Sequence, residues 1–266
     1  MQNTLHTLLF DNHYDPLSTS TTSPTPYDTL PPVIQNALLN RQRIILIANN
    51  PSISQATLDA LLQPTDMLVL FNDFVHAEFF ARHELAKTLP KLLFFRQIGD
   101  SLLHFGLPPR SNNVALINEM ATQAPLGILL SNTTYQFPTP ADDPRPNDDP
   151  VTEDRIIVIP KTLHDLLQSD EQCRVLSERH DVVADYPSFT HIHSSAPTSG
   201  FLLYRLLLAA RLEVRELQPE RALLEIMMLG FNDSDKTAHF WEGHNWTFER
   251  QELATPPNGV DIVRQY

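Results

Sequence analysis

The sequence predicts an α/β protein of the Rossmann-like class, with a mostly parallel sheet and helices on both of its faces. Two observations predict it. Short runs of β-branched and other apolar residues recur along the chain, and they have the length and continuity of strands that are buried on both faces. Segments with helical spacing of apolar residues separate several of these runs, which is typical of a parallel sheet built from strand–helix–strand units.

Five strands are predicted between residues 43 and 159. Three closely spaced runs come first, at residues 43–48 (RIILIA), 67–71 (MLVLF) and 91–96 (KLLFFR). A fourth strand is expected at residues 126–130 and a fifth at residues 155–159 (RIIVI). Because these runs do not alternate with polar residues, helices should cover both sides of the sheet.

Helices are predicted between and after these strands. Residues 54–62 form the first, with Ser52 as its cap, and residues 77–88 form the second. Residues 200–212 form a longer helix, since their leucines recur at helical spacing. Residues 222–229 (ALLEIMML) fit a helix or a last buried strand, and their position just before a Gly-Phe turn favours the strand.

The chain divides into an arm and one domain. Residues 1–32 are predicted to form an irregular N-terminal arm, because residues 15–32 are rich in Ser, Thr and Pro. Residues 33–266 then form a single α/β domain. Within it, residues 138–150 contain many prolines and aspartates, and a surface loop, a mobile lid and a disordered segment all fit this composition.

The composition excludes some partners and locations. A net charge of −13 argues against nucleic acid as a partner, since no broad basic surface would neutralise phosphates. The single cysteine, Cys173, cannot form an intrachain disulfide, which favours a reducing compartment. Residues 1–16 lack the features of a secretory signal, and no apolar stretch is long enough to span a bilayer. We therefore expect a cytoplasmic protein, with peripheral contact at a membrane left open.

Polar residues follow three of the predicted strands, where parallel sheets bind ligands. Asn49, Asn50 and Ser52 follow the first strand at a helix start, an arrangement that suits a phosphate or a nucleotide sugar. An ordinary capped turn is the alternative. Asn72 follows the second strand, and Arg96 ends the third, where it can face a phosphate or pair with an acid.

The segment HIHSSAPTSG precedes the long predicted helix. The hydroxyls of Thr198 and Ser199 fall where the first free amides of that helix point, so with Gly200 they predict an anion-binding helix start. A simple helix cap is the alternative, and His193 adds weight to the ligand site. His191 and His193 also suggest a metal, but no carboxylate lies near them in sequence, so none is expected.

The richest segment is residues 239–250 (HFWEGHNWTFER), which holds both tryptophans of the chain. His244 and His239 are suited to proton transfer at neutral pH. Glu249, five residues after His244, can orient that ring or anchor the segment through the backbone. Aromatic residues that seal the core are the alternative for the tryptophans, but they leave the polar residues between them unexplained.

Taken together and in this order, these segments resemble the motifs of the sialyltransferases, both the animal enzymes and the bacterial ones that use CMP-sialic acid. IILIANNPS resembles the first nucleotide-binding motif, and LFNDF resembles the second strand with its nucleotide-contacting Asn. APTSGFLLYRLLL is similar to the motif that caps a helix at the CMP phosphate. GHNWTFE matches the final His-x4-Glu motif, and MMLGFND resembles the strand and turn before it. The animal enzymes carry a cysteine pair that is absent here, so the bacterial ones are more similar.

The resemblance implies a GT-A-like variant of the Rossmann-like fold and a role in bacterial surface glycan biosynthesis. The enzyme would move a sialic acid or related ulosonic acid from CMP-sialic acid or a CMP-Kdo-like donor to a glycan or lipooligosaccharide-type acceptor. Transfer would proceed with inversion and without a metal. The resemblance further implies that His244 is the base, with His239 as the reserve, and that Glu249 is a positioning residue. The contacts to CMP would come from Asn49, Asn72, Thr198, Ser199 and Gly200.

Two alternatives stay open at this point. One is a non-catalytic relative that binds a nucleotide or a glycan. The other is a metal hydrolase built on His191, His193, His239 and His244.

Overall fold

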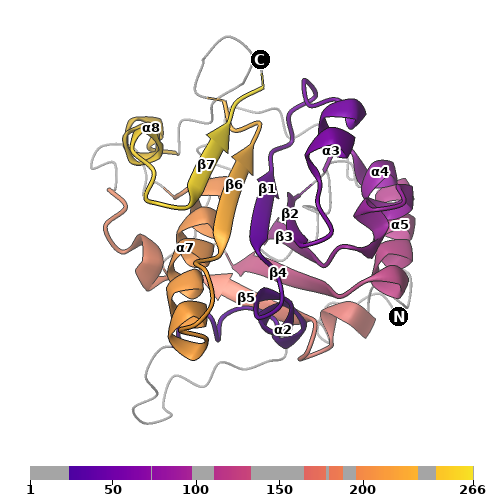
Figure 1. Ribbon diagram of the computed structural model, residues 1–266, viewed down its shortest axis with the longest axis horizontal. Coiled ribbons are helices and arrows are strands. Elements are labelled where there is room, and N and C mark those ends of the chain that lie inside the picture. Colours follow the sequence, from indigo (N-terminus) through magenta and orange to yellow (C-terminus); the bar gives the residue numbers. More distant parts are fainter. Residues whose placement is uncertain are drawn as a thin grey trace, which may run out of the picture.

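The computed structural model describes residues 24–72, 74–97, 111–132, 165–177, 180–187, 196–232 and 244–265. Within them a seven-stranded, all-parallel sheet has the order β5-β4-β3-β2-β1-β6-β7 (Figure 1). The predicted α/β, Rossmann-like class is therefore confirmed. The strands are β1 (Arg43–Ile47), β2 (Asp66–Phe71), β3 (Lys91–Gln97), β4 (Leu126–Asn132), β5 (Cys173–Ser177), β6 (Glu225–Leu229) and β7 (Val260–Val263).

The strand order reverses at β1. From β1 the chain adds β2, β3, β4 and β5 on one side, and it then returns to the other side of β1 to add β6 and β7. Ile45 of β1 therefore pairs with Leu68 of β2 on one edge and with Met227 of β6 on the other. In open parallel sheets such a switch point, at the carboxyl ends of the strands, is where ligands bind.

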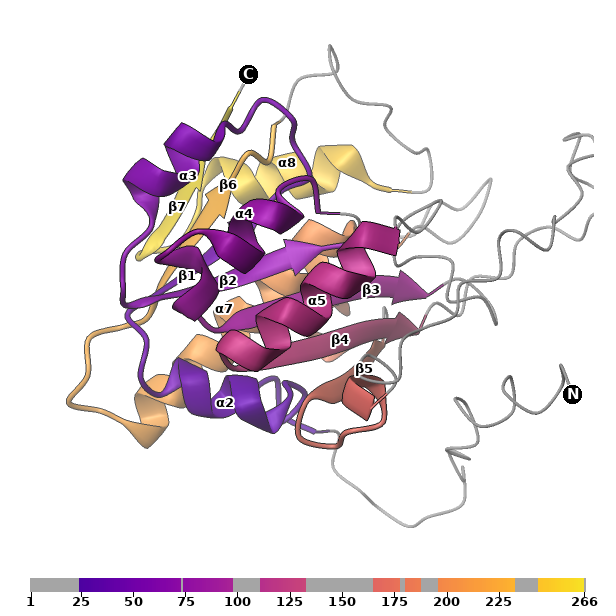
Figure 2. The ribbon, with the colours of Figure 1, turned by 90° about the vertical axis from the view of Figure 1, so that its right-hand side faces the viewer.

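Helices cover both faces of the sheet (Figures 1 and 2). One face carries the crossover helices of the first strands, and the opposite face carries α7 and α8. Two short helices, η1 (Ala86–Thr88) and η3 (Asp181–Val183), lie in connections. The helices are α2 (Pro32–Leu38), α3 (Gln55–Leu61), α4 (Ala77–Arg82), α5 (Ser111–Gln123), α7 (Ser199–Leu217) and α8 (Trp246–Ala254).

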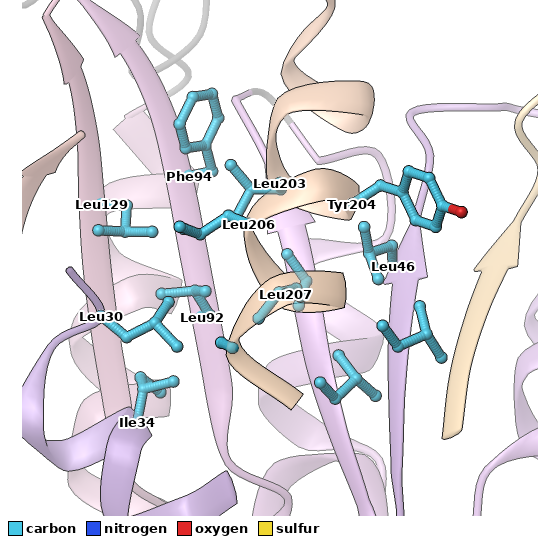
Figure 3. Close-up of a cluster of buried hydrophobic side chains, with 14 of the residues drawn as sticks. Leu30, Ile34, Leu46, Leu92, Phe94, Leu129, Leu203, Tyr204, Leu206 and Leu207 are labelled. Carbon is cyan, nitrogen blue, oxygen red and sulfur yellow. The ribbon is translucent and has the colours of Figure 1, made fainter. Parts of the chain in front are cut away.

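The helix α7 provides most of the helical side of one core. Leu203, Leu206 and Leu207 on α7 are fully buried in one cluster with Leu46 of β1 and Phe94 of β3 (Figure 3). Burying a leucine side chain contributes roughly 2 kcal/mol. The packing of these leucines therefore fixes the position of α7 on the sheet, and with it the position of the helix start at the carboxyl edge.

The strands with continuous apolar runs match their predictions closely. The first four strands are confirmed to within two residues, and residues 225–229 form a strand rather than a helix. The edge strands β5 and β7, and the helices α2, α5 and α8, were not predicted. The predicted strand at residues 155–159 and the loop at residues 138–150 lie outside the described residues.

Three helix predictions need correction. Ser52 does not cap α3: the cap is Ser54, whose side chain accepts a hydrogen bond from the amide of Thr57. The helix predicted at residues 77–88 is two helices, because His83 leaves the helical region with a ψ of 137°. The helix predicted at residues 200–212 continues to Leu217.

The end of the predicted N-terminal arm belongs to the domain. Leu30 is fully buried in the core beside α7, and Pro32 begins α2. A proline is well suited to that position. It has no amide hydrogen, and the first amide of a helix has no intrahelical acceptor in any case. Of the described helices, none combines the length and the apolar character that a membrane span requires.

Lys91 is a buried ionisable residue at the start of β3. Its side chain is 0% exposed, and its Nζ donates to the carbonyls of Ala86, Leu89 and Lys87 at 2.7, 2.8 and 3.3 Å. Burial lowers the pKa of Lys91 from 10.5 to about 7. The unfolded chain therefore holds one more proton than the native state between these two values.

This proton difference predicts that stability rises with pH above 7. The slope should approach 1.4 kcal/mol per pH unit, about the value for one proton, and it should disappear in Lys91→Met. Urea unfolding between pH 7 and 9 measures it. Above that window Cys173 has the opposite effect on stability, because burial raises the pKa of its thiol to about 11. The native state then keeps a proton that the unfolded chain loses, and this lowers stability as the pH rises. Lys87→Met, which removes a neighbouring surface lysine, serves as the control; an identical slope in Lys91→Met and the wild type would contradict the prediction.

Candidate functional site

The ends of three strands and the start of α7 meet at the switch point. The amide of Ala48, after β1, donates to the carbonyl of Leu229 at the end of β6. Asn49 Nδ2 donates to the carbonyl of Phe71 at the end of β2, at 2.7 Å. Asn72 Nδ2 then lies 3.5 Å from Ser199 Oγ, on the first residue of α7. Residues more than 120 positions apart in sequence are therefore neighbours here.

Asn72 has an uncommon backbone conformation. Its φ is 47°, the one positive φ among the described residues other than glycine. Asparagine tolerates this region better than most residues. The amide of Asn72 donates to the carbonyl of Phe94 at 2.7 Å, so the chain stays attached to β3 as it turns. This turn directs the side chain of Asn72 towards the start of α7.

Gly230, in the turn after β6, and Gly200, in the first turn of α7, allow close packing around that turn. A Cβ on Gly200 would clash with Cε1 of Phe231, so α7 begins against this ring. Phe231 in turn packs edge-on against Phe71, with ring centroids 5.9 Å apart. Gly230 has a φ of +79°, and a Cβ there would lie 2.5 Å from Cδ1 of Ile53. Both positions therefore require glycine.

The first turn of α7 presents amides at this edge. Thr198 is the cap: its Oγ1 accepts from the amide of Phe201 at 3.1 Å, and its carbonyl accepts from the amide of Leu202 at 2.9 Å. The amides of Ser199 and Gly200 precede these bonds and have no acceptor within the helix. They point out of the positive end of a 19-residue helix.

Glu249 of α8 joins the starts of two helices. Its side chain is buried, with an exposed fraction of 5% for the residue. Oε1 accepts from the amide of Thr198 at 2.8 Å and from the hydroxyl of Tyr186 at 2.9 Å, and Oε2 accepts from Thr198 Oγ1 at 2.7 Å. The carboxylate lies at the start of α7 and in the first turn of α8, and both positions favour a negative charge.

His244 is attached to the same helix start. Its Nδ1 lies 2.6 Å from the carbonyl oxygen of Ala196, which can only accept a hydrogen bond. In the neutral ring Nδ1 therefore carries the proton, and Nε2 carries the lone pair. The following residue, Asn245, caps α8 by accepting from the amide of Phe248 at 3.1 Å. Trp246 stands edge-on to the His244 ring, with centroids 5.3 Å apart.

Thr198 and Asn50, two further residues predicted to bind the ligand, also use their side chains within the protein. The hydroxyl hydrogen of Thr198 points to Glu249, so this hydroxyl does not donate to a ligand in this arrangement. Asn50 Nδ2 donates to the carbonyls of Gly230 and Gln265 at 3.1 and 2.8 Å, and its Oδ1 accepts from the amide of Ser52. Asn50 therefore attaches the C-terminal segment to the switch point.

The remaining predicted residues divide into three groups. Asn49, Asn72, Ser199 and Gly200 lie together at the carboxyl edge. Ser52 is exposed in the turn after β1. Arg96 belongs to β3, but its side chain lies outside the described residues, as do His191, His193 and His239.

Three residues at this edge were not anticipated. Tyr186 contacts α8 through its hydroxyl. Asn232 and Gln265 pair with each other: Asn232 Oδ1 accepts from the backbone amide of Gln265, and Asn232 Nδ2 donates to the backbone carbonyl of Gln265. A weak signal existed for Asn232, because it follows a strand as Asn49 and Asn72 do. For Tyr186 and Gln265 the sequence offers none.

No cluster of three potential metal ligands among His, Cys, Asp and Glu occurs in the described part of the chain. No protein-family model matches the sequence. A search of curated proteins likewise gives no significant match.

The three hydrogen bonds of Glu249 predict that its removal is costly. Glu249→Ala should lower the free energy of unfolding by about 3 kcal/mol, because it leaves two donors of Thr198 and one of Tyr186 without their acceptor. Glu252→Gln is the matched control one turn along α8. It breaks the partly exposed pair with Arg205, which should change stability by less than about 1 kcal/mol. Equal losses in the two variants, measured by urea unfolding, would contradict this role for Glu249.

Proposed function

We propose that this protein is a sialyltransferase-like glycosyltransferase that moves a sialic acid or a related ulosonic acid from a CMP-activated donor to a glycan acceptor. One observation carries the proposal. The segments that resemble the family's motifs meet at one edge of the sheet, through the contacts of Asn72 with Ser199, of Glu249 with Thr198 and of His244 with Ala196.

The start of α7 is the proposed contact for the donor phosphate. The amides of Ser199 and Gly200 have no intrahelical acceptor, and hydrogen bonds from such amides stabilise an anion. The carboxylate of Glu249 offsets part of the positive end of the helix. Recognition would therefore depend on directed hydrogen bonds from these amides, with Asn72 and Asn49 close by, more than on net charge.

His244 is the proposed general base. Because Nδ1 donates to the carbonyl of Ala196, the neutral ring has the tautomer in which Nε2 can accept a proton. Nε2 would take the proton of the acceptor hydroxyl as its oxygen attacks the anomeric carbon, and CMP would leave from the opposite face with inversion. The amides of Ser199 and Gly200 would stabilise the charge that develops on the leaving phosphate. The reaction so written uses no metal.

The proposal includes a cytoplasmic location. An acceptor such as a lipooligosaccharide would then be reached by peripheral contact with a membrane. The single cysteine, which cannot form an intrachain disulfide, supports the location but does not identify the acceptor.

Turnover of CMP-sialic acid and CMP-Kdo tests the proposal. The wild type should release CMP from one of them, and His244→Asn should reduce kcat by roughly 10²–10⁴-fold, the usual contribution of a general base. Asparagine keeps an N–H near the position of Nδ1, so the variant should retain the Tm of the wild type. His83→Asn is the control, since His83 lies next to α4, on the opposite face of the sheet, and stacks on Phe79.

Three results would count against the proposal. If the wild type released no CMP from either donor, the activity would be refuted and a binding protein would be favoured. Loss of turnover in a chelator would favour the metal hydrolase. Full turnover by His244→Asn would exclude His244 as the base.

A further inference from the structure

The hydroxyl of Tyr186 makes two hydrogen bonds to the start of α8. It accepts from the backbone amide of Asn245 at 2.7 Å and donates to Glu249 Oε1 at 2.9 Å. Asn245 follows His244 directly in the chain, so the hydroxyl holds the peptide group that joins these two residues. Tyr186 therefore fixes the backbone of His244, while the carbonyl of Ala196 fixes its ring.

The position of this hydroxyl is set by the packing of the Tyr186 ring. The ring packs edge-on against Phe248 of α8, with centroids 5.4 Å apart, and lies 5.9 Å from the ring of Phe201 in the first turn of α7. Aromatic pairs in this range contribute beyond simple burial and prefer a defined geometry. The ring of Tyr186 therefore lies between the starts of α7 and α8, and this packing sets the position of its hydroxyl.

The segment that carries Tyr186 is attached to α7 through Arg205, which also pairs with Glu252 of α8. Arg205 of α7 donates from Nε to the carbonyl of Val182 at 2.9 Å and pairs with Asp185 at 2.7 Å. The amide of Tyr186 itself donates to the carbonyl of Val183 at 3.0 Å. The backbone around Tyr186 is thus held against α7, and the Tyr186 hydroxyl connects it to the start of α8.

We infer that Tyr186 is a positioning residue for His244, an inference that rests on the function proposed above. Tyr186 lies outside all five segments that resemble the motifs of the family. Its two hydrogen bonds hold Nε2 of His244 at a fixed place relative to the start of α7, where the donor would bind. Misplacement of a catalytic group by about 1 Å can reduce turnover 100-fold, so one missing hydroxyl has a measurable effect.

Tyr186→Phe tests the inference, because it keeps both ring contacts and removes both hydrogen bonds. We expect kcat to fall roughly 10- to 100-fold, while KM for the CMP-sugar stays within about twofold. A fall in kcat without a change in KM indicates that Tyr186 positions His244 and does not contribute to donor binding. The matched control is Asp185→Asn, which loosens the neighbouring residue by removing its exposed pair with Arg205 and should keep the kcat of the wild type.

The ¹⁵N NMR signals of the His244 imidazole give a second readout that needs no substrate. The wild type should show the tautomer protonated at Nδ1, and Tyr186→Phe should show a mixture with the tautomer protonated at Nε2. If the wild type proved inactive, the proposed function would fail, and a changed tautomer would still support the positioning role. An unchanged tautomer together with unchanged kcat in Tyr186→Phe would overturn the inference. An equal loss of kcat in Asp185→Asn would overturn it as well, since the effect would then be a general loosening of the segment.

Discussion

The buried carboxylate of Glu249 at the start of α7 is the interaction on which this edge of the molecule depends. Burying a carboxylate is costly unless hydrogen bonds and favourable charges compensate. Here three hydrogen bonds, from Thr198 and Tyr186, and the positive ends of α7 and α8 do so. The same contacts attach α8 to α7, and they place His244 beside the helix that the leucine core fixes on the sheet.

The sheet explains why this arrangement lies at the switch point. The crossover from β5 to β6 passes over the face opposite to α3, α4 and α5, and α7 therefore starts at the carboxyl edge near the reversal of strand order (Figures 1 and 2). The turns after β1, β2 and β6 end at the same place. Asn49, Asn72 and Phe231 in these turns contact their neighbours across the edge.

The sequence predicted the strands correctly where burial on both faces produces a continuous run of apolar residues. The central strands are apolar between their ends because both their faces are covered. All four predicted runs of this kind that the structure describes are strands. The edge strands β5 and β7 were missed because most of their residues are partly exposed and have no such pattern. The helix α8 was missed because its most buried residue is Glu249, a charged side chain that no apolar periodicity reveals.

The site was predictable only in part for a related reason. A position after a strand or before a helix can be recognised locally, which is why Asn49, Asn72 and Ser199 could be named. Whether a polar side chain faces a ligand or another part of the protein depends on distant residues. Thr198 donates to Glu249, 51 positions away, and Asn50 donates to Gln265, 215 positions away. Neither pairing leaves a trace in the local sequence.

The central claim is that the start of α7 receives the phosphate of a CMP donor. The most direct test is a titration of ¹⁵N-labelled protein with CMP, followed through the backbone amides and compared with UMP and GMP. The amides of Ser199 and Gly200 should shift saturably with CMP and much less with the other nucleotides, while the amide of Gly259, at the opposite edge of the sheet, should stay in place. Saturation by CMP without movement of the Ser199 and Gly200 signals, or the same response to all three nucleotides, would contradict the account.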